Sequence, residues 1–103
     1  MEIIDNSFAG HKNYHYKFNG GLVLSICFGP GAYCSPRVYQ WKMEDYKSVE
    51  IAFIKNGNFI SHREAGLEMV ALDSGDDDVY RYVPVTTVKD IIQLLKQKEQ
   101  GSN

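Results

Sequence analysis

The sequence lacks long apolar runs and an excess of charge of one sign. Its longest apolar stretch is only a few residues, whereas a helix that spans a bilayer needs about 20. The 11 basic and 13 acidic residues leave a net charge of −2. This balance argues against a protein that coats nucleic acid, which needs a large positive excess, and against a DNA mimic, which needs a dense negative field. We therefore expect neither a membrane nor a nucleic acid as partner.

Targeting signals and cysteines are also scarce. The first residues contain neither the basic stretch nor the apolar stretch of a secretory signal. The two cysteines, Cys27 and Cys34, are too few for a disulfide framework. We expect a cytoplasmic protein with both thiols reduced. The alternative is a Cys27–Cys34 disulfide across the intervening Gly-Pro-Gly loop.

Alternating side chains predict most of the secondary structure. Residues 14–18 place Tyr14, Tyr16 and Phe18 on one face, which is the period of a half-buried strand. The Asn-Gly-Gly sequence that follows favours a hairpin turn, because such turns need positive φ. The same criteria predict further strands at 22–28, 48–54, 58–60 and 79–83, with a second hairpin turn at Asn56-Gly57.

One helix is predicted near the C-terminal end. Four aliphatic residues at helical spacing form a single apolar stripe: Val88, Ile91, Ile92 and Leu95. Thr86 or Thr87 is expected to cap this helix after Pro84 ends the last strand. We predict one α+β domain over residues 1–103, an antiparallel sheet of about four to six strands with the C-terminal helix packed on one face. Residues 99–103 are expected to form a frayed tail, and the other sheet face is expected to carry tyrosine and phenylalanine side chains.

The connection over residues 29–47 is long for so small a domain, and such loops are usually functional or mobile. The chain has 7 tyrosines, and several large aromatic residues fall in this loop. Tyrosine and tryptophan dominate protein-binding hot spots because they bury much area at low entropy cost. We predict a protein-binding site with aromatic anchors and an acidic rim, formed by Tyr33, Tyr39, Trp41, Tyr46, Asp76, Asp77 and Asp78. The alternative is that the aromatic residues form a second small core.

No residue pattern points to catalysis or to a bound metal or cofactor. The cysteines and the three histidines (His11, His15 and His62) do not form the two closely spaced pairs of a structural zinc site. The acidic turn at 73–78 lacks the pattern of an EF-hand. Pro30 removes a donor from the Gly-Pro-Gly loop, which is therefore not a phosphate cradle. We predict a protein that is not an enzyme and that uses no metal or cofactor.

Several strands and turns form a recognisable series: an Asn-Gly-led strand (19–26), a loop with Gly29, Pro30 and Tyr33, a strand of the VEVAVL type (48–54) with the Asn56-Gly57 turn, and the C-terminal helix. This series resembles a group of small uncharacterised proteins from tailed bacteriophages. Residues 61–78 are additional to the group's pattern, and its Asp-Thr-Pro element is missing. The resemblance implies a phage or prophage origin and an accessory role in the infected cell. It brings no catalytic residues.

Three functional hypotheses follow. The first is a non-enzymatic phage accessory protein that binds a host protein in the cytoplasm of the infected cell, for instance to inhibit a defence system such as a CRISPR effector. The second is a protein that binds or sequesters a small nucleotide signal in a tyrosine-lined pocket. The third is an enzyme that uses Cys34 or a histidine, for which no sequence feature indicates the contact that a Cys–His pair needs. A homodimer through an outer strand is also compatible with the sequence, with residues 14–18 as the expected sheet edge.

Overall fold

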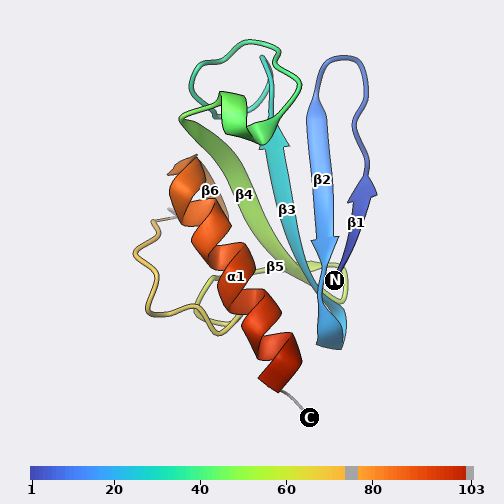
Figure 1. Cartoon of the computed structure of the whole chain (residues 1–103), viewed down its shortest axis with the longest axis vertical. Coiled ribbons are helices and arrows are strands. Elements are labelled where there is room, and N and C mark those ends of the chain that lie inside the picture. Colours follow the sequence, from blue (N-terminus) through green and yellow to red (C-terminus); the bar gives the residue numbers. More distant parts are fainter. Residues whose placement is uncertain (74–76, 102–103) are drawn as a thin grey trace.

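The chain folds into an antiparallel sheet with a C-terminal helix lying across one of its faces (Figure 1). The computed structural model describes residues 1–73 and 77–101. The strands are β1 (Glu2–Asp5), β2 (Lys12–Lys17), β3 (Leu22–Phe28), β4 (Ser48–Lys55), β5 (Asn58–Ile60) and β6 (Val79–Pro84), and the helix is α1 (Val85–Gly101). The strand order is β1-β2-β3-β4-β5, and β6 also pairs with β4. The predicted α+β class, with a C-terminal helix, is confirmed.

Glycine and asparagine set two of the hairpin turns. The turn between β2 and β3 is the 3-10 segment η1 (Asn19–Gly21), in which Gly20 and Gly21 have φ of 78° and 79°. Asn56 and Gly57 join β4 to β5 with φ of 52° and 82°. Glycine adopts these left-handed conformations without steric cost, and asparagine tolerates them better than most residues. Both predicted hairpins are confirmed.

The core lies between the sheet and α1. Residues that lie directly opposite each other in an antiparallel sheet share a face, and β3 and β4 place Leu24 opposite Phe53 and Ile26 opposite Ile51. All four side chains are at most 1% exposed. The other large, fully buried side chains come from β3, β4, β6, the helix and the connections; they are Phe28, Val49, Tyr80, Val88, Ile91, Leu95, Cys34 and Leu67.

The tyrosines of β2 lie on the same face of the sheet as the helix. Tyr14 is opposite Ile26 and Tyr16 is opposite Leu24, and both tyrosines pack against the core. The prediction that the uncovered face carries the strand tyrosines is therefore wrong for these residues. The physical reason is that α1 covers only part of the sheet, so the two large rings extend the apolar layer toward β1.

The helix begins at Val85, directly after β6. Neither Thr86 nor Thr87 is therefore its cap, and that prediction is wrong. The Val85 N–H donates to the carbonyl oxygen of Lys47 at 3.0 Å, so a backbone group from a distant loop satisfies one of the first helical donors in place of a side chain. The helix continues through Gly101, into the residues expected to fray, and the last two positions lie outside the described residues.

The sheet edge next to β2 is β1 (Figure 1), so the prediction that residues 14–18 form the edge is wrong. β1 pairs Glu2 with Lys17 and Asp5 with Tyr14. Its sequence has two isoleucines between two acidic residues. Because this pattern has no period-two alternation, the criterion that identified the other strands does not detect it.

Replacing Ile91 with alanine tests the contact between helix and sheet. Ile91 is fully buried, whereas its neighbour Ile92 is only partly buried. Truncating a packed core residue removes transfer free energy and leaves a cavity, at a cost of about 2–5 kcal/mol. We expect Ile91→Ala to lower the free energy of unfolding by that amount and Ile92→Ala to lower it clearly less, as measured by urea denaturation. Equal losses would contradict the observed orientation of the helix.

Candidate functional site

The buried side chain of Tyr46 connects the segment between β3 and β4 to the core. Its ring is buried and lies 4.9 Å, centroid to centroid, from the ring of Phe28. Its hydroxyl donates to the carbonyl oxygen of Val38 at 2.6 Å and accepts the N–H of Gln40 at 2.9 Å. Tyr46 therefore belongs to the core, which corrects the prediction that it is a surface anchor and agrees for this residue with the alternative of ordinary packing.

The backbone held by Tyr46 carries two exposed aromatic rings. Tyr39 and Trp41 are 41% and 72% exposed, and their rings meet edge to face with centroids 5.5 Å apart. The ammonium group of Lys12, on β2, lies 5.2 Å from the centroid of Trp41 and 5.9 Å from that of Tyr39. Cation–π attraction therefore links this loop to β2. Lys12, Tyr39 and Trp41 are termed the Trp41 cluster below.

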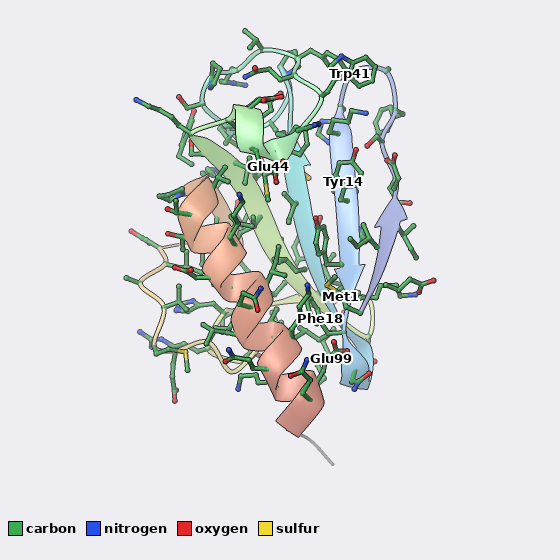
Figure 2. The ribbon with its side chains drawn as sticks, viewed as in Figure 1. Met1, Tyr14, Phe18, Trp41, Glu44 and Glu99 are labelled. Atoms are coloured by element: carbon green, nitrogen blue, oxygen red, sulfur yellow. The ribbon has the colours of Figure 1, made fainter. Side chains whose placement is uncertain are left out.

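A pocket of about 270 Å³ opens beside Trp41 on the helix-covered face of β1, β2 and β3. Its walls are formed by Ile3, Tyr14, Tyr16, Ile26, Phe28, Trp41, Lys42, Met43 and Glu44. In Figure 2, Trp41 lies at the top, Tyr14 lies below it on β2, and Glu44 lies on the turn η2 (Met43–Asp45). This Tyr14 pocket is mostly apolar, with two phenol hydroxyls and one side chain of each charge.

The phenol of Tyr16 in this pocket is suited to hydrogen bonding rather than to acid–base chemistry. Burial raises the pKa of Tyr16, and the neighbouring carboxylate of Glu44 raises it further. Tyr16 therefore keeps its proton at neutral pH, and its hydroxyl can both donate and accept a hydrogen bond. A neutral phenol in an apolar wall can orient a bound group without reacting with it.

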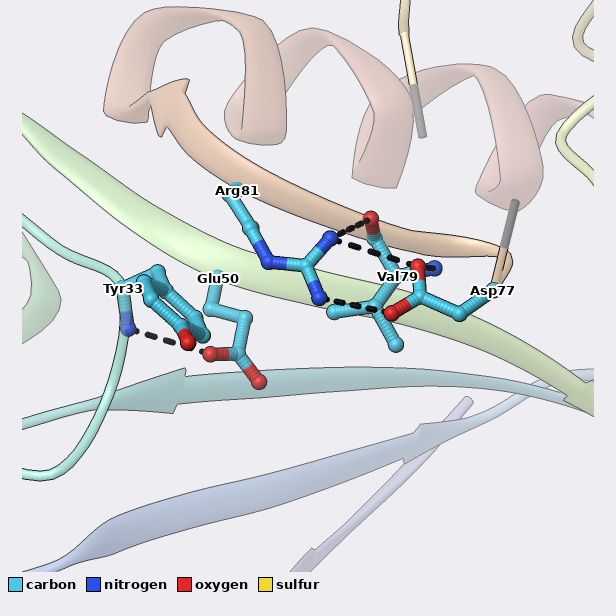
Figure 3. Close-up of polar contacts among 5 residues, drawn as sticks. All are labelled: Tyr33, Glu50, Asp77, Val79 and Arg81. Atoms are coloured by element: carbon cyan, nitrogen blue, oxygen red, sulfur yellow. Dashed lines mark hydrogen bonds and ion pairs between the residues drawn. The ribbon is translucent and has the colours of Figure 1, made fainter. Parts of the chain in front are cut away.

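Tyr33 belongs to a different group of side chains, on the sheet face without the helix. Its N–H donates to Oε1 of Glu50 at 3.0 Å (Figure 3), and Glu50 alternates with buried residues of β4 that face the core. The guanidinium carbons of Arg81 and Arg37 lie 4.9 Å and 5.4 Å from the Tyr33 ring centroid. The Tyr82 ring meets the Tyr33 ring edge to face, with centroids 6.1 Å apart. These five residues are termed the Tyr33 patch.

Of the predicted acidic rim, Asp77 lies near Tyr33, to which it is linked through Arg81. The carboxylate of Asp77 accepts two hydrogen bonds from Arg81, at 2.6 Å and 3.2 Å (Figure 3), and these bonds hold the pKa of Asp77 below its usual value. Asp78 is half-buried, with φ of 55°, and Asp76 lies outside the described residues. The structure thus divides the predicted site: Tyr39 and Trp41 lie together, and Tyr33 and Asp77 lie elsewhere.

The residue types considered for catalysis or metal binding are dispersed. Cys34 is fully buried, and its Sγ lies 3.3 Å from the carbonyl oxygen of Gly29. His62 is buried with Nδ1 2.9 Å from the hydroxyl of Tyr80. Both cysteines are free thiols. Within residues 1–73 and 77–101, no three histidine, cysteine, aspartate or glutamate side chains gather as a metal site would require.

Sequence reasoning missed most walls of the Tyr14 pocket. Alternation identifies Tyr14 and Tyr16 as one face of a strand, but it does not say which face meets the helix. Ile3 and Met43 lie in segments without recognisable periodicity. The one available signal is the pair of tyrosines at alternate positions, because large rings beside an apolar strand extend the core beyond a single helix.

Comparison of the chain with protein-family models, with curated proteins and with solved structures gives no match in any of the three. The resemblance to phage proteins, and the origin that it implies, therefore stay predictions. In the part of the chain that the structure describes, no helix combines the length and apolarity needed to cross a bilayer.

Removing only the hydroxyl of Tyr46 tests its role in ordering the loop. Tyr46→Phe leaves the Val38 carbonyl and the Gln40 N–H without this partner, and unsatisfied groups cost about 1–3 kcal/mol. We expect a loss of unfolding free energy in that range and faster proteolysis around residues 38–46. The fluorescence of Trp41, the only tryptophan, should also shift. Tyr82→Phe, at an exposed ring, is the control and should change stability by less than about 0.5 kcal/mol; equal effects would contradict the assignment.

Cys27 gives a pH-dependent test of the face without the helix. Burial raises the pKa of its thiol, and the carboxylate of Glu50 raises it further. The thiolate is the reactive form, so alkylation should need a higher pH than at an exposed cysteine. Glu50→Gln removes the charge and keeps an oxygen for the Tyr33 N–H. It should lower the thiol pKa and speed alkylation by iodoacetamide near neutral pH, as followed by peptide mass spectrometry; an unchanged pH profile would contradict this.

Proposed function

We propose that this protein is a non-enzymatic phage accessory protein that binds a host protein through the Trp41 cluster and the Tyr14 pocket. The observation that carries the proposal is the setting of Trp41. Its ring is 72% exposed, yet it is fixed beside an apolar pocket by Tyr39, Lys12 and the loop that Tyr46 anchors. Protein-binding hot spots combine such rigid aromatic anchors with adjoining pockets.

The fixed geometry reduces the cost of binding. Ordering a mobile side chain at an interface costs about 0.5–1.5 kcal/mol. The edge-to-face contact of Tyr39 with Trp41 and the ammonium group of Lys12 over both rings restrict these rings before a partner arrives. Less of the binding free energy is therefore spent on ordering these side chains, and the affinity for the partner is higher.

The size of the pocket favours a side chain of a partner protein. Its volume of about 270 Å³ falls below the range of about 300–1,000 Å³ that is usual for small-molecule sites. A single large apolar side chain, inserted between Tyr14, Phe28 and Met43, fits the mostly apolar lining. Lys42 and Glu44 at the same pocket offer one charge of each sign for polar contacts.

The role in the infected cell is part of the proposal and rests on the resemblance to phage proteins. A small protein without a catalytic set acts by occupying a surface that its target needs. We propose that the target is a cytoplasmic host protein and that a defence protein, such as a CRISPR effector, is blocked in this way. Tyr39 and Trp41 are the anchors retained from the sequence prediction.

A second candidate function is the binding of a small nucleotide signal, and the tyrosine lining of the pocket favours it. The hydroxyls of Tyr14 and Tyr16 could hydrogen-bond a base, whose faces also stack on aromatic rings. Against this stands the scarcity of cations for phosphate groups, since Lys42 is the one base among the wall residues. A thermal-shift panel of nucleotides decides the matter: a rise in Tm that Tyr14→Phe reduces would favour the small ligand.

Alanine substitution of Trp41 tests the protein-binding function. We expect Trp41→Ala to reduce affinity capture of the host protein by about tenfold or more, because truncation of a hot-spot aromatic residue costs about 2 kcal/mol or more. Phe59→Ala is the matched control, since Phe59 is also an exposed aromatic residue, at 55%, but lies on β5, away from the pocket walls. It should leave capture unchanged.

Further alanine variants distinguish the Trp41 cluster from the Tyr33 patch as the binding surface. Capture that is lost in Trp41→Ala and Tyr39→Ala but retained in Phe59→Ala and Tyr33→Ala supports the proposal. Capture that survives Trp41→Ala and is lost in Tyr33→Ala would assign binding to the Tyr33 patch instead and would overturn it. Quantification by mass spectrometry, with circular dichroism to verify folding of each variant, makes the comparison.

A further inference from the structure

In the part of the chain that the structure describes, β1 has one side without a strand neighbour. It pairs with β2 and ends the strand order of the described sheet (Figure 1). Phe8 and His11, just beyond β1, exchange both backbone hydrogen bonds, at 3.0 Å and 2.8 Å, and form a hydrogen-bonded pair in the same register as β1 and β2. Two residues earlier, the Asn6 N–H donates to the carbonyl oxygen of Asn13 at 2.8 Å, while the Asn13 N–H donates to Oγ of Ser7. Such pairs alternate along antiparallel strands. Ile4 therefore directs its N–H and C=O toward β2, whereas Ile3 and Asp5 direct theirs outward.

The residues with outward backbone groups carry their side chains on the pocket side. Ile3 lies opposite Tyr16 and is itself a wall of the Tyr14 pocket. Asp5 lies opposite Tyr14 and therefore on the same face. If an antiparallel strand added to this edge, the residue bonded to Ile3 would have its Cα about 5.5 Å away and its side chain on the same face. That side chain would point toward the pocket.

The negative charge of Asp5 favours an added strand that carries a basic residue. Asp5 is exposed, and hydrogen bonds from Ser7 hold its pKa below the usual value. Lys12, whose positive charge also lowers the pKa of Asp5, has its ammonium group over the rings of Tyr39 and Trp41. A lysine or arginine two residues from the pocket-filling side chain would face Asp5, because side chains two apart share one face of a strand.

A second copy of this chain fits the edge less well. Two β1 strands side by side would bring Glu2 and Asp5 from both copies to one seam, with no basic residue in either strand. Acidic residues on an edge strand disfavour such self-pairing. A strand that supplies positive charge is therefore the better complement than a second β1.

We propose that the partner protein adds an extended segment to β1, bonded to the outward backbone groups of Ile3 and Asp5, with a large apolar side chain in the Tyr14 pocket. The segment carries a basic residue two positions from that apolar residue. The inference rests on the proposed function and adds to it the conformation and chemistry of the partner. Main-chain bonds to the edge supply affinity, and the pocket supplies specificity.

Amide hydrogen exchange on the full chain, measured by NMR, tests this binding mode. The probe is the capped peptide Thr-Lys-Val-Phe-Val-Lys-Thr, in which phenylalanine and both lysines share one strand face. In the protein alone, the amides of Ile3 and Asp5 should exchange faster than that of Ile4. The peptide should slow exchange at Ile3 and Asp5 by about tenfold or more and leave Ile4 unchanged.

Two variants make the test specific. Ile3→Pro removes one outward N–H and none that bonds β2, and proline is tolerated where the N–H of an edge strand faces solvent. It should abolish peptide binding, while Ile3→Val, which keeps the N–H, should retain it. Asp5→Lys leaves the backbone unchanged and should weaken binding of the lysine peptide by about tenfold through like-charge repulsion.

Several outcomes would overturn the proposal. These are absence of peptide binding at millimolar concentration, binding that survives both Ile3→Pro and Asp5→Lys, and shifts at Trp41 without protection of Ile3 and Asp5. Protection that rises with protein concentration, with a mass of twice 11.7 kDa, would make the second copy the occupant. Failure of the proposed function itself is recognised separately, by capture of the host protein that survives Trp41→Ala.

Discussion

The buried phenol of Tyr46 is the contact on which the candidate site depends. The segment from β3 to β4 is joined to the sheet by a bridge between Ser35 and Ser48, by a few backbone bonds and by side-chain contacts with Lys12 and Glu50. Tyr46 adds an apolar ring against Phe28 and a hydroxyl that bonds backbone groups on both sides of Tyr39. Tyrosine suits this task because it joins a large apolar body to a polar end. A loop that is long by sequence is therefore tied to the core next to its exposed rings.

Local patterns predict the interior of the sheet but not its limits. Alternation and turn chemistry identify β2, β3 and β4, each of which has one apolar face. They also locate β6, where an irregularity in the pairing with β4 breaks the alternation, so that Tyr82 is exposed and Val83 is buried. β1 was missed because Glu2–Asp5 offers no alternation, and the helix start was misplaced because the Lys47 carbonyl caps Val85 across the fold. Composition finds the aromatic residues of the site, yet it cannot separate Tyr46 from Trp41. Tyr46 is buried because it packs against Phe28, which is distant in the sequence, whereas Trp41 is exposed.

The two aromatic groups differ in how far their polar atoms are already satisfied. In the Tyr33 patch, Arg81 is bonded to Asp77 and Glu50 accepts the Tyr33 N–H. Tyr82 has φ of 53°, next to an irregularity in the pairing of β4 and β6, and such a conformation costs about 1–3 kcal/mol. In this conformation the Tyr82 ring lies edge to face against the Tyr33 ring. The Trp41 cluster has a pocket beside it, which is why we assign binding there.

The pocket, the exposed tryptophan and the open edge have a common origin in the size of the chain. One helix of 17 residues packs against a sheet of six strands. The helix lies toward the β4 side of the sheet and does not extend over β1 and β2 (Figure 1). The remaining part of the same face is covered by the rings of Tyr14 and Tyr16 and by the loop that carries Trp41 and η2. Where this cover is incomplete, the apolar walls of the pocket are exposed to solvent. Exposed apolar patches on a small protein are usually limited in area and are often binding sites. Because the uncovered part lies at the strand edge, a partner that fills it also meets unpaired backbone groups, so the two features are best satisfied by one extended chain.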